Sequence, residues 1–244
     1  MSRGRVVWLA ADDSPDAFPP VDNALSEPDG LLAAGGDLTT PRLLAAYRQG
    51  IFPWYDEGQP LLWWSPDPRC VFERGDLHLS RRLRKEIRRS TLQVRFNTAF
   101  PEVIQACAGP RRHQEGTWIT RDMLSAYERL NREGWAHSVE VWRDDRLVGG
   151  LYGLVIGRAF FGESMFSGES NASKMALLTI DRLLDDGRLG ILDCQVRSSH
   201  LLSLGAATMP RTTFVTKLDE LCEPPAPFQA WPEAPVRVAE FGQT

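Results

Sequence analysis

The sequence lacks any apolar run of the roughly 18 to 20 residues that a membrane-spanning helix needs. A short apolar stretch near the N-terminus is interrupted at once by Asp12 and Asp13, so we expect no secretory signal there. Together these absences predict a cytoplasmic protein that does not interact with a membrane. The 244 residues are 43% hydrophobic and 25% charged, which is typical of a globular chain and excludes collagen, coiled coil and disorder as descriptions of the whole.

Cysteine and histidine are also scarce. The four cysteines form no CxxC pair, and the four histidines show no metal-ligand spacing. We therefore predict no zinc ribbon, no thioredoxin-type site and no bound metal, and we expect reduced thiols. Cys194 with His200 as its base is a conceivable nucleophile, but strand alternation turns Cys194 away from its polar neighbours and favours a small core residue.

Lysine is rare as well, since only three of the 28 basic residues are lysines, and the net charge is -4. The net charge argues weakly against nucleic acid, but one segment concentrates cations. Residues 79–90 are predicted to form an amphipathic helix that buries Leu79, Leu83 and Ile87. The opposite face carries Arg81, Arg84, Lys85, Arg88 and Arg89. A solvated face usually mixes charge signs, so this face indicates a polyanion, with simple solvation as the alternative.

Composition and apolar periodicity divide the chain into three parts. Residues 1–65 are expected to form a small N-terminal α/β domain, irregular up to residue 35 and with a helix over 40–50 that Gly50 ends. Residues 66–222 are expected to form the larger domain, and residues 223–244 a proline-rich tail over the surface. In the larger domain we predict helices over 119–134, 171–186 and 200–206, and strands over 137–142, 147–157, 159–166 and 190–196. Asn171 is expected to cap the second of these helices.

This order of elements predicts an α+β fold, with an antiparallel or mixed sheet flanked by helices. It resembles the acyl-CoA N-acyltransferase fold, in which a splayed strand pair lets an amine attack an activated acyl group. The glycine-rich pyrophosphate loop of those enzymes is missing where the main helix begins, because residues 167–171 read SGESN. The likeness therefore concerns the fold and gives no support for coenzyme A.

Three polar residues interrupt the predicted apolar strands. Glu163 stands near the end of one strand, and Asp193 and Gln195 lie two residues apart on the next, where the strand period places both on one face. Polar groups on a buried strand are costly unless they are paired. They form either a network that holds two strands in register or a patch that positions an amine and relieves it of a proton. A glycosidase-type pair of Glu163 and Asp193 has no other support.

Two tryptophans also stand out, because Trp54 follows a proline-fixed aromatic segment and Trp118 follows a flexible loop. Each is predicted either to pack in the core or to offer a stacking platform for a nucleic-acid base.

Nine short motifs occur in order along the chain. They are GLLA with GGDL (30–38), YRQGIFPW (47–54), LWWSPDPR (62–69), EGTWIT (115–120), VGGLYG (148–153), GESMFS (162–167), NASK (171–174), DCQ (193–195) and SLGA (203–206). Any one of them is weak, but the ordered set resembles the leucyl/phenylalanyl-tRNA–protein transferases, bacterial enzymes of the N-end-rule pathway.

The resemblance implies that leucine or phenylalanine, with methionine as a further candidate, moves from tRNA to the α-amine of proteins that begin with Arg or Lys. Such labelling marks the acceptor for degradation. Because the tRNA ester is already activated, the resemblance implies no ATP, metal or coenzyme. Separately, no long apolar strip suggests an oligomer, so we expect a monomer. A relative that uses acyl-CoA and a non-catalytic RNA-binding module are the alternatives.

The resemblance also assigns roles to the residues identified above. Gln195 would accept a hydrogen bond from the attacking amine, Asp193 would orient it, and Glu163 would hold the cationic acceptor. Trp54 and Trp118 would hold the terminal adenosine, and the basic helix would bind the tRNA backbone. An apolar pocket would take the side chain of the transferred amino acid and exclude β-branched ones by shape; its expected members are Leu151, Met165, Leu177, Ile180 and Leu192.

Replacing Arg84, Lys85 and Arg88 by glutamine is expected to weaken tRNA binding and to flatten its salt dependence. If all three contact phosphates, the slope of log K against log salt concentration should fall by about 2 to 3 units. Binding titrations at several salt concentrations measure this slope. An unchanged slope would mean that the basic helix is merely solvated.

Overall fold

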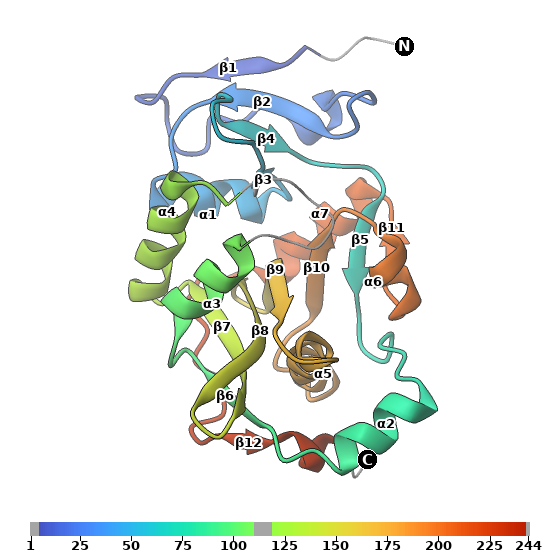
Figure 1. Ribbon diagram of the computed structural model, residues 1–244. Coiled ribbons are helices and arrows are strands. Elements are labelled where there is room, and N and C mark those ends of the chain that lie inside the picture. Colours follow the sequence, from blue (N-terminus) through green and yellow to red (C-terminus); the bar gives the residue numbers. More distant parts are fainter. Residues whose placement is uncertain (1–4, 110–118, 243–244) are drawn as a thin grey trace.

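Two sheets form the framework of the protein. The computed structural model describes residues 5–109 and 119–242 and has a mixed α+β architecture, as expected (Figure 1). The smaller sheet has the order β1-β2-β4-β3, and the larger has the order β11-β5-β10-β9-β8-β7-β6-β12. The strands of the smaller sheet are β1 (Val7–Leu9), β2 (Leu31–Gly35), β3 (Phe52–Pro53) and β4 (Leu62–Trp64). Those of the larger sheet are β5 (Arg69–Phe72), β6 (Gln93–Phe96), β7 (Ala136–Arg143), β8 (Arg146–Ile156), β9 (Ala159–Ser167), β10 (Ile191–Gln195), β11 (Ala207–Met209) and β12 (Val236–Arg237).

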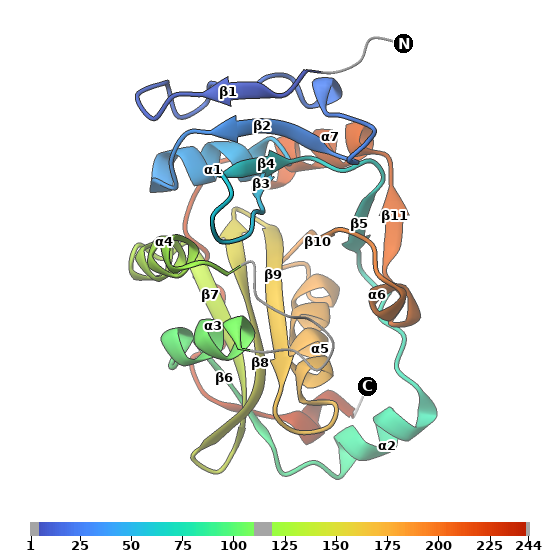
Figure 2. The same cartoon turned by 45° about the horizontal axis from the view of Figure 1, so that its top comes forward.

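Helices cover both faces of the larger sheet. The α-helices are α1 (Thr40–Arg48), α2 (Arg81–Arg88), α3 (Phe100–Ala108), α4 (Arg121–Arg132), α5 (Ala172–Asp185), α6 (Ser199–Ser203) and α7 (Arg211–Leu221), and the short 3-10 helices are η1 (Val21–Asn23) and η2 (Val238–Gly242). Helices α3 and α4 lie on one face of the sheet and α5 on the other (Figure 2). Across the two described stretches, no helix combines the length and apolarity that crossing a bilayer requires.

Most predicted central elements are confirmed to within about two residues, although α6 ends three residues before the predicted helix. The strands β5 and β6 and the helix α3 were not predicted, and both ends of the chain also differ from prediction. Residues 1–35 contain β1 and β2, and the unpredicted α7 follows β11. The sequence of α7 is rich in β-branched residues, which mask its helical spacing of Phe214 and Leu218. The C-terminal segment is more than a surface tail, because β12 pairs with β6 and Val238 is fully buried.

The start of α5 lies unusually close to the sheet. A Cβ atom at Gly149 would come within 2.4 Å of the Cβ of Ala172, so only glycine permits this approach. Asn171 precedes the helix as predicted, but it does not cap it. Its φ is 63°, and its side chain bonds Glu86 and Lys174 instead. Ser167 Oγ accepts the Ser173 amide and supplies a partner for this helix end.

The neighbouring parallel strands β9 and β10 separate halfway along. Their pairing runs from Ala159 opposite Ile191 to Phe161 opposite Asp193, after which β9 continues with β8 alone. Glu163 and Gln195 each stand two residues beyond the last paired position. The separation therefore brings these two predicted site residues to facing edges of one opening.

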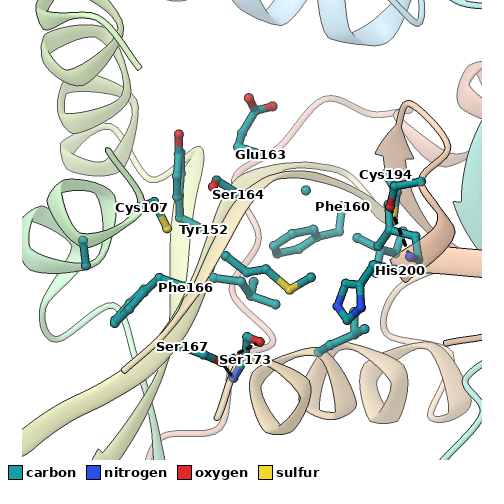
Figure 3. A pocket seen from close by; sticks show the side chains of 18 of the residues that line it. Cys107, Tyr152, Phe160, Glu163, Ser164, Phe166, Ser167, Ser173, Cys194 and His200 are labelled. Carbon is teal, nitrogen blue, oxygen red and sulfur yellow. Dashed lines mark hydrogen bonds between the residues drawn. The ribbon is translucent and has the colours of Figure 1, made fainter. Parts of the chain in front are cut away.

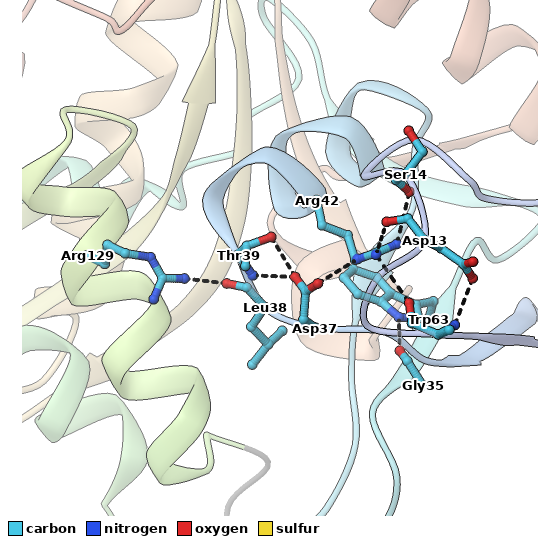
Figure 4. Close-up of polar contacts among 10 residues, drawn as sticks. Asp13, Ser14, Gly35, Asp37, Leu38, Thr39, Arg42, Trp63 and Arg129 are labelled. Atoms are coloured by element: carbon cyan, nitrogen blue, oxygen red, sulfur yellow. Dashed lines mark hydrogen bonds and ion pairs between the residues drawn. The ribbon is translucent and has the colours of Figure 1, made fainter.

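The buried Arg42 and the half-buried Arg129 fix helix α1 between the two sheets. Arg42 donates to the backbone carbonyls of Ala10, Asp13 and Ser14, and Arg129 of α4 donates to the Leu38 carbonyl (Figure 4). Such bonds connect α1 to the irregular N-terminal chain and to α4. Helix α1 is thus held in place before it contributes to the site.

The buried His137 of β7 predicts a loss of stability in acid. Burial lowers its pKa to about 4, and its Nδ1 accepts a hydrogen bond from Trp231. Below the ordinary pKa of 6.5, the His137 imidazole binds a proton in the unfolded chain but stays neutral in the folded chain until the pH approaches 4. The free energy of unfolding should therefore fall by about 2 kcal/mol from this group between pH 7 and pH 5.

Urea unfolding of the wild type and His137→Gln at both pH values isolates this contribution. The wild type should lose about 2 kcal/mol more than the variant, because glutamine does not titrate. Equal losses in the two proteins would show that His137 is not held neutral.

Candidate active site

Glu163 of β9 is the centre of the site. Its Oε1 accepts hydrogen bonds from the Tyr47 hydroxyl at 2.6 Å and from Gln195 Nε2 at 2.9 Å. The Tyr47 hydroxyl also contacts that of Tyr127, so α1, α4 and β10 all converge on one carboxylate. Glu163 Oε2 is buried and has no hydrogen-bond partner among the described residues.

Burial makes Glu163 a weak acid. Removal from water raises its pKa to about 7, although the Tyr47 hydrogen bond opposes the shift. By contrast, the fully buried Glu140 accepts hydrogen bonds from the amides of Thr98 and Ala99 and from the Ser138 hydroxyl. A buried carboxylate with a vacant oxygen, as in Glu163, is therefore suited to meet a positively charged or N–H-bearing group.

Asp193 of β10 is fully buried and forms a two-point ion pair with Arg69 of β5. The Arg69 Nε and Nη2 atoms lie 2.8 and 2.7 Å from the two carboxylate oxygens of Asp193. The third arm, Nη1, donates to the Gly50 carbonyl at 3.0 Å. Asp193 is thus engaged within the protein, on the side of the strand away from the cavity described below.

The regular alternation of β10 ends at Gln195. The pairing with β5 shifts register between Asp193 and Gln195, and Gln195 has a φ of 62°. The two side chains have different partners, because Asp193 reaches Arg69 and Gln195 reaches Glu163. Cys194, between them, lines the cavity and packs against the core cluster that α5 forms with the sheet. A hydrogen bond with Cys70 together with burial raises the pKa of its thiol, which disfavours a nucleophilic thiolate.

A cavity of about 690 Å³ opens where β9 and β10 part. Figure 3 shows Glu163 at one end, Ser167 and Ser173 at the other, and Cys194 and His200 on the β10–α6 side. Four of the five predicted pocket residues line it, namely Leu151, Met165, Leu177 and Leu192. Ile180 does not, because it is fully buried in the core that α5 forms with the sheet.

The described residues among the predicted nucleic-acid contacts do not line this cavity. Trp54 follows β3 and is 41% exposed, with its ring tilted against that of Trp64 at 5.6 Å between centroids. Trp118 lies outside the described residues. All five predicted cations on or next to α2 are exposed, and none makes an ion pair within the ranges 5–109 and 119–242.

Sequence analysis missed three residues that build this site: Arg69, Tyr47 and Tyr127. Arg69 and Tyr47 occur inside motifs that we singled out, but nothing local distinguishes them from ordinary core or surface residues. Their partners are more than 100 residues away along the chain, at Asp193 and Glu163. Only the folded arrangement reveals these contacts.

A carboxylate that lines a cavity and an amide that contacts it are suited to position an amine for acyl transfer. Comparison with known proteins identifies the class more closely. Residues 71–219 match the family model of leucyl/phenylalanyl-tRNA protein transferase, and residues 36–67 match that of its N-terminal domain. The chain belongs to the leucyl/phenylalanyl-tRNA–protein transferase family and is an aminoacyltransferase.

Relatives of that name align over most of both chains. The transferase of Stutzerimonas stutzeri is 56% identical over 213 residues, which cover 87% of this chain and 93% of the relative. That of Azoarcus sp. is 55% identical over 214 residues, covering 88% and 90%. That of Pseudomonas aeruginosa is 54% identical over 220 residues, covering 90% and 96%.

The raised pKa of Glu163 predicts that this carboxylate destabilises the fold at neutral and alkaline pH. Its contribution to stability is fully present below pH 4.5 and is lost as the pH rises through about 7. Glu163→Gln should therefore raise the free energy of unfolding at pH 8 by up to about 3 kcal/mol, and by little at pH 4.

Denaturant unfolding at the two pH values measures this effect. Glu140→Gln is the matched control and should destabilise, because it weakens hydrogen bonds to a buried carboxylate. A destabilised Glu163→Gln at pH 8 would contradict the assigned cost of the buried charge.

Proposed function

We propose that the protein transfers leucine or phenylalanine, and methionine as a further donor residue, from tRNA to proteins that begin with Arg or Lys. The observation that carries the acceptor assignment is the vacant Oε2 of Glu163 beside Gln195. A carboxylate in this position attracts a cationic acceptor end and disfavours a neutral one. The products would be N-terminally extended proteins marked for N-end-rule degradation.

The cavity supports the assignment of the donor. Its lining of Leu151, Met165, Leu177 and Leu192 suits an apolar or aromatic side chain that is not branched at Cβ. Ile180 would shape this wall from behind, through its packing in the core, and would make no contact with the side chain. Trp54 offers an exposed ring for the terminal adenosine, with Trp118 as its proposed companion, and the unpaired cations of α2 would bind the tRNA backbone.

The proposed chemistry is aminolysis of an ester. The acceptor nitrogen attacks the carbonyl carbon, the bond to the ribose oxygen breaks, and a proton passes from the nitrogen to that oxygen. The contact of Gln195 Nε2 with Glu163 leaves Gln195 Oε1 to accept a hydrogen bond from the amine. Because an amide is a poor base, Gln195 positions the neutral amine, while Glu163 provides the negative charge that binds the cationic side chain of the acceptor's first residue.

The separation of β9 from β10 resembles the splayed strands of N-acyltransferases and supports the same geometry of attack. We further propose that the enzyme acts as a monomer in the cytoplasm, where charged tRNA is available.

The decisive assay follows radiolabelled leucine from leucyl-tRNA to a model protein beginning with Arg, beside matched proteins beginning with Lys and with Ala. We expect label on the Arg and Lys proteins, without added ATP or coenzyme A, and loss of transfer after RNase treatment. Equal labelling of the Ala protein would contradict the role of Glu163. Transfer of label only from an acyl-CoA donor would contradict aminoacyl-tRNA as the donor.

A further inference from the structure

Arg69 is the most completely engaged cation near the site. It is fully buried, and its guanidinium lies between the rings of Phe52 and Phe214, at 4.8 and 4.7 Å from their centroids. Its Nε and Nη2 atoms bind Asp193, and Nη1 binds the Gly50 carbonyl. The planar group is thus fixed by two aromatic faces and three polar contacts, which leaves it a single orientation.

Asp193 is correspondingly unavailable to a substrate. Each of its oxygens accepts an Arg69 N–H, and Oδ1 also accepts the backbone N–H of Gln195 at 2.8 Å. The carboxylate is fully buried. It therefore acts through Gln195, and it does so through the backbone of that residue.

The backbone of Gln195 needs such support. Its φ of 62° is in the left-handed region, which is strained for a residue other than glycine. The hydrogen bond to Asp193 stabilises this conformation, and the conformation directs the Gln195 side chain to Glu163. A rigid Arg69 would in turn fix the position of Asp193.

Helix α1 anchors both halves of the site. Tyr47, near its C-terminal end, binds Glu163, and Gly50, just after it, binds Arg69. The positions of Glu163 and, through Arg69 and Asp193, of Gln195 thus both depend on one short segment of the N-terminal region. This explains physically why a segment outside the larger sheet matters to the chemistry.

We propose that Arg69 is a positioning residue of the transferase: through Asp193 it holds the left-handed backbone of Gln195, and so the amide that aligns the acceptor amine. The inference deepens the proposed function and rests on it. It predicts that loss of Arg69 acts on turnover through Gln195, whereas a merely structural arginine would lower stability alone.

Arg69→Lys is the first variant, because it keeps the charge beside Asp193 but cannot reproduce the three-armed contact. We expect kcat to fall about tenfold or more, with KM for leucyl-tRNA and for the Arg protein changed less than about threefold. Arg182→Lys is the matched control, since Arg182, near the C-terminal end of α5, is half-buried and also donates to a backbone carbonyl, that of Phe241, but away from the site. It should lose stability and keep its kcat.

Arg69→Met with Asp193→Leu removes both charges together, which avoids leaving one buried charge unpaired. We expect kcat to fall by about the same factor as in Gln195→Ala. Adding Gln195→Ala to the double variant should cause little further loss of kcat, because all three substitutions remove the same positioning of the Gln195 amide. Losses that multiply, or a near-normal kcat in either Arg69 variant, would overturn the proposal. If the double variant does not fold, Arg69→Lys decides alone.

Amide hydrogen exchange at Gln195 tests the link independently of activity. Arg69→Lys should speed this exchange about tenfold or more relative to neighbouring β10 amides, and Arg182→Lys should not. If the wild type shows no transferase activity but the variants show this exchange pattern, the proposed function is contradicted, while the structural coupling of Arg69 to Gln195 is supported. Unchanged exchange in an active enzyme would defeat the link alone.

Discussion

The buried ion pair between Arg69 and Asp193 is the interaction on which the site depends. Two charges removed from water destabilise the fold unless each satisfies the other, and here the two-point contact does so with neither group exposed. The pair joins β5 to β10 at the point where β10 leaves β9. It thereby secures the end of the strand that borders the cavity, and it binds the end of α1 through Gly50.

Glu163 presents the opposite electrostatic situation. Two neutral donors contact one of its oxygens, the other remains without a partner among the described residues, and burial raises its pKa to about 7. Such a group lowers stability in the free enzyme and regains favourable contacts when a cation or amine arrives. The protein thus combines two different carboxylates on the neighbouring strands β9 and β10. Asp193 has its hydrogen bonds satisfied and orders the backbone, whereas Glu163 has an unsatisfied oxygen and lines the cavity.

The arrangement also suits a family whose substrates are two macromolecules. Because the ester is already activated, the main requirement for catalysis is that the protein holds an amine near the ester carbonyl. The opening between β9 and β10 provides the place, the apolar wall accommodates a side chain, and the exposed cations of α2 offer charge to a polyanion. These features lie on different elements of one sheet and its flanking helices, so the fold, rather than any single motif, assembles the candidate site.

The sequence by itself determined the α+β class, the central strands and helices, the exposed basic face of α2, and the polar residues Glu163 and Gln195, because local periodicity and short motifs carry that information. It also indicated the family. The tertiary structure alone decided that Asp193 pairs with Arg69, that Tyr47 binds Glu163, that Ile180 stands behind the cavity wall, and that Gln195 leaves the regular strand. Each of these depends on contacts between residues far apart in the chain or on a left-handed backbone turn, and strand alternation predicts neither.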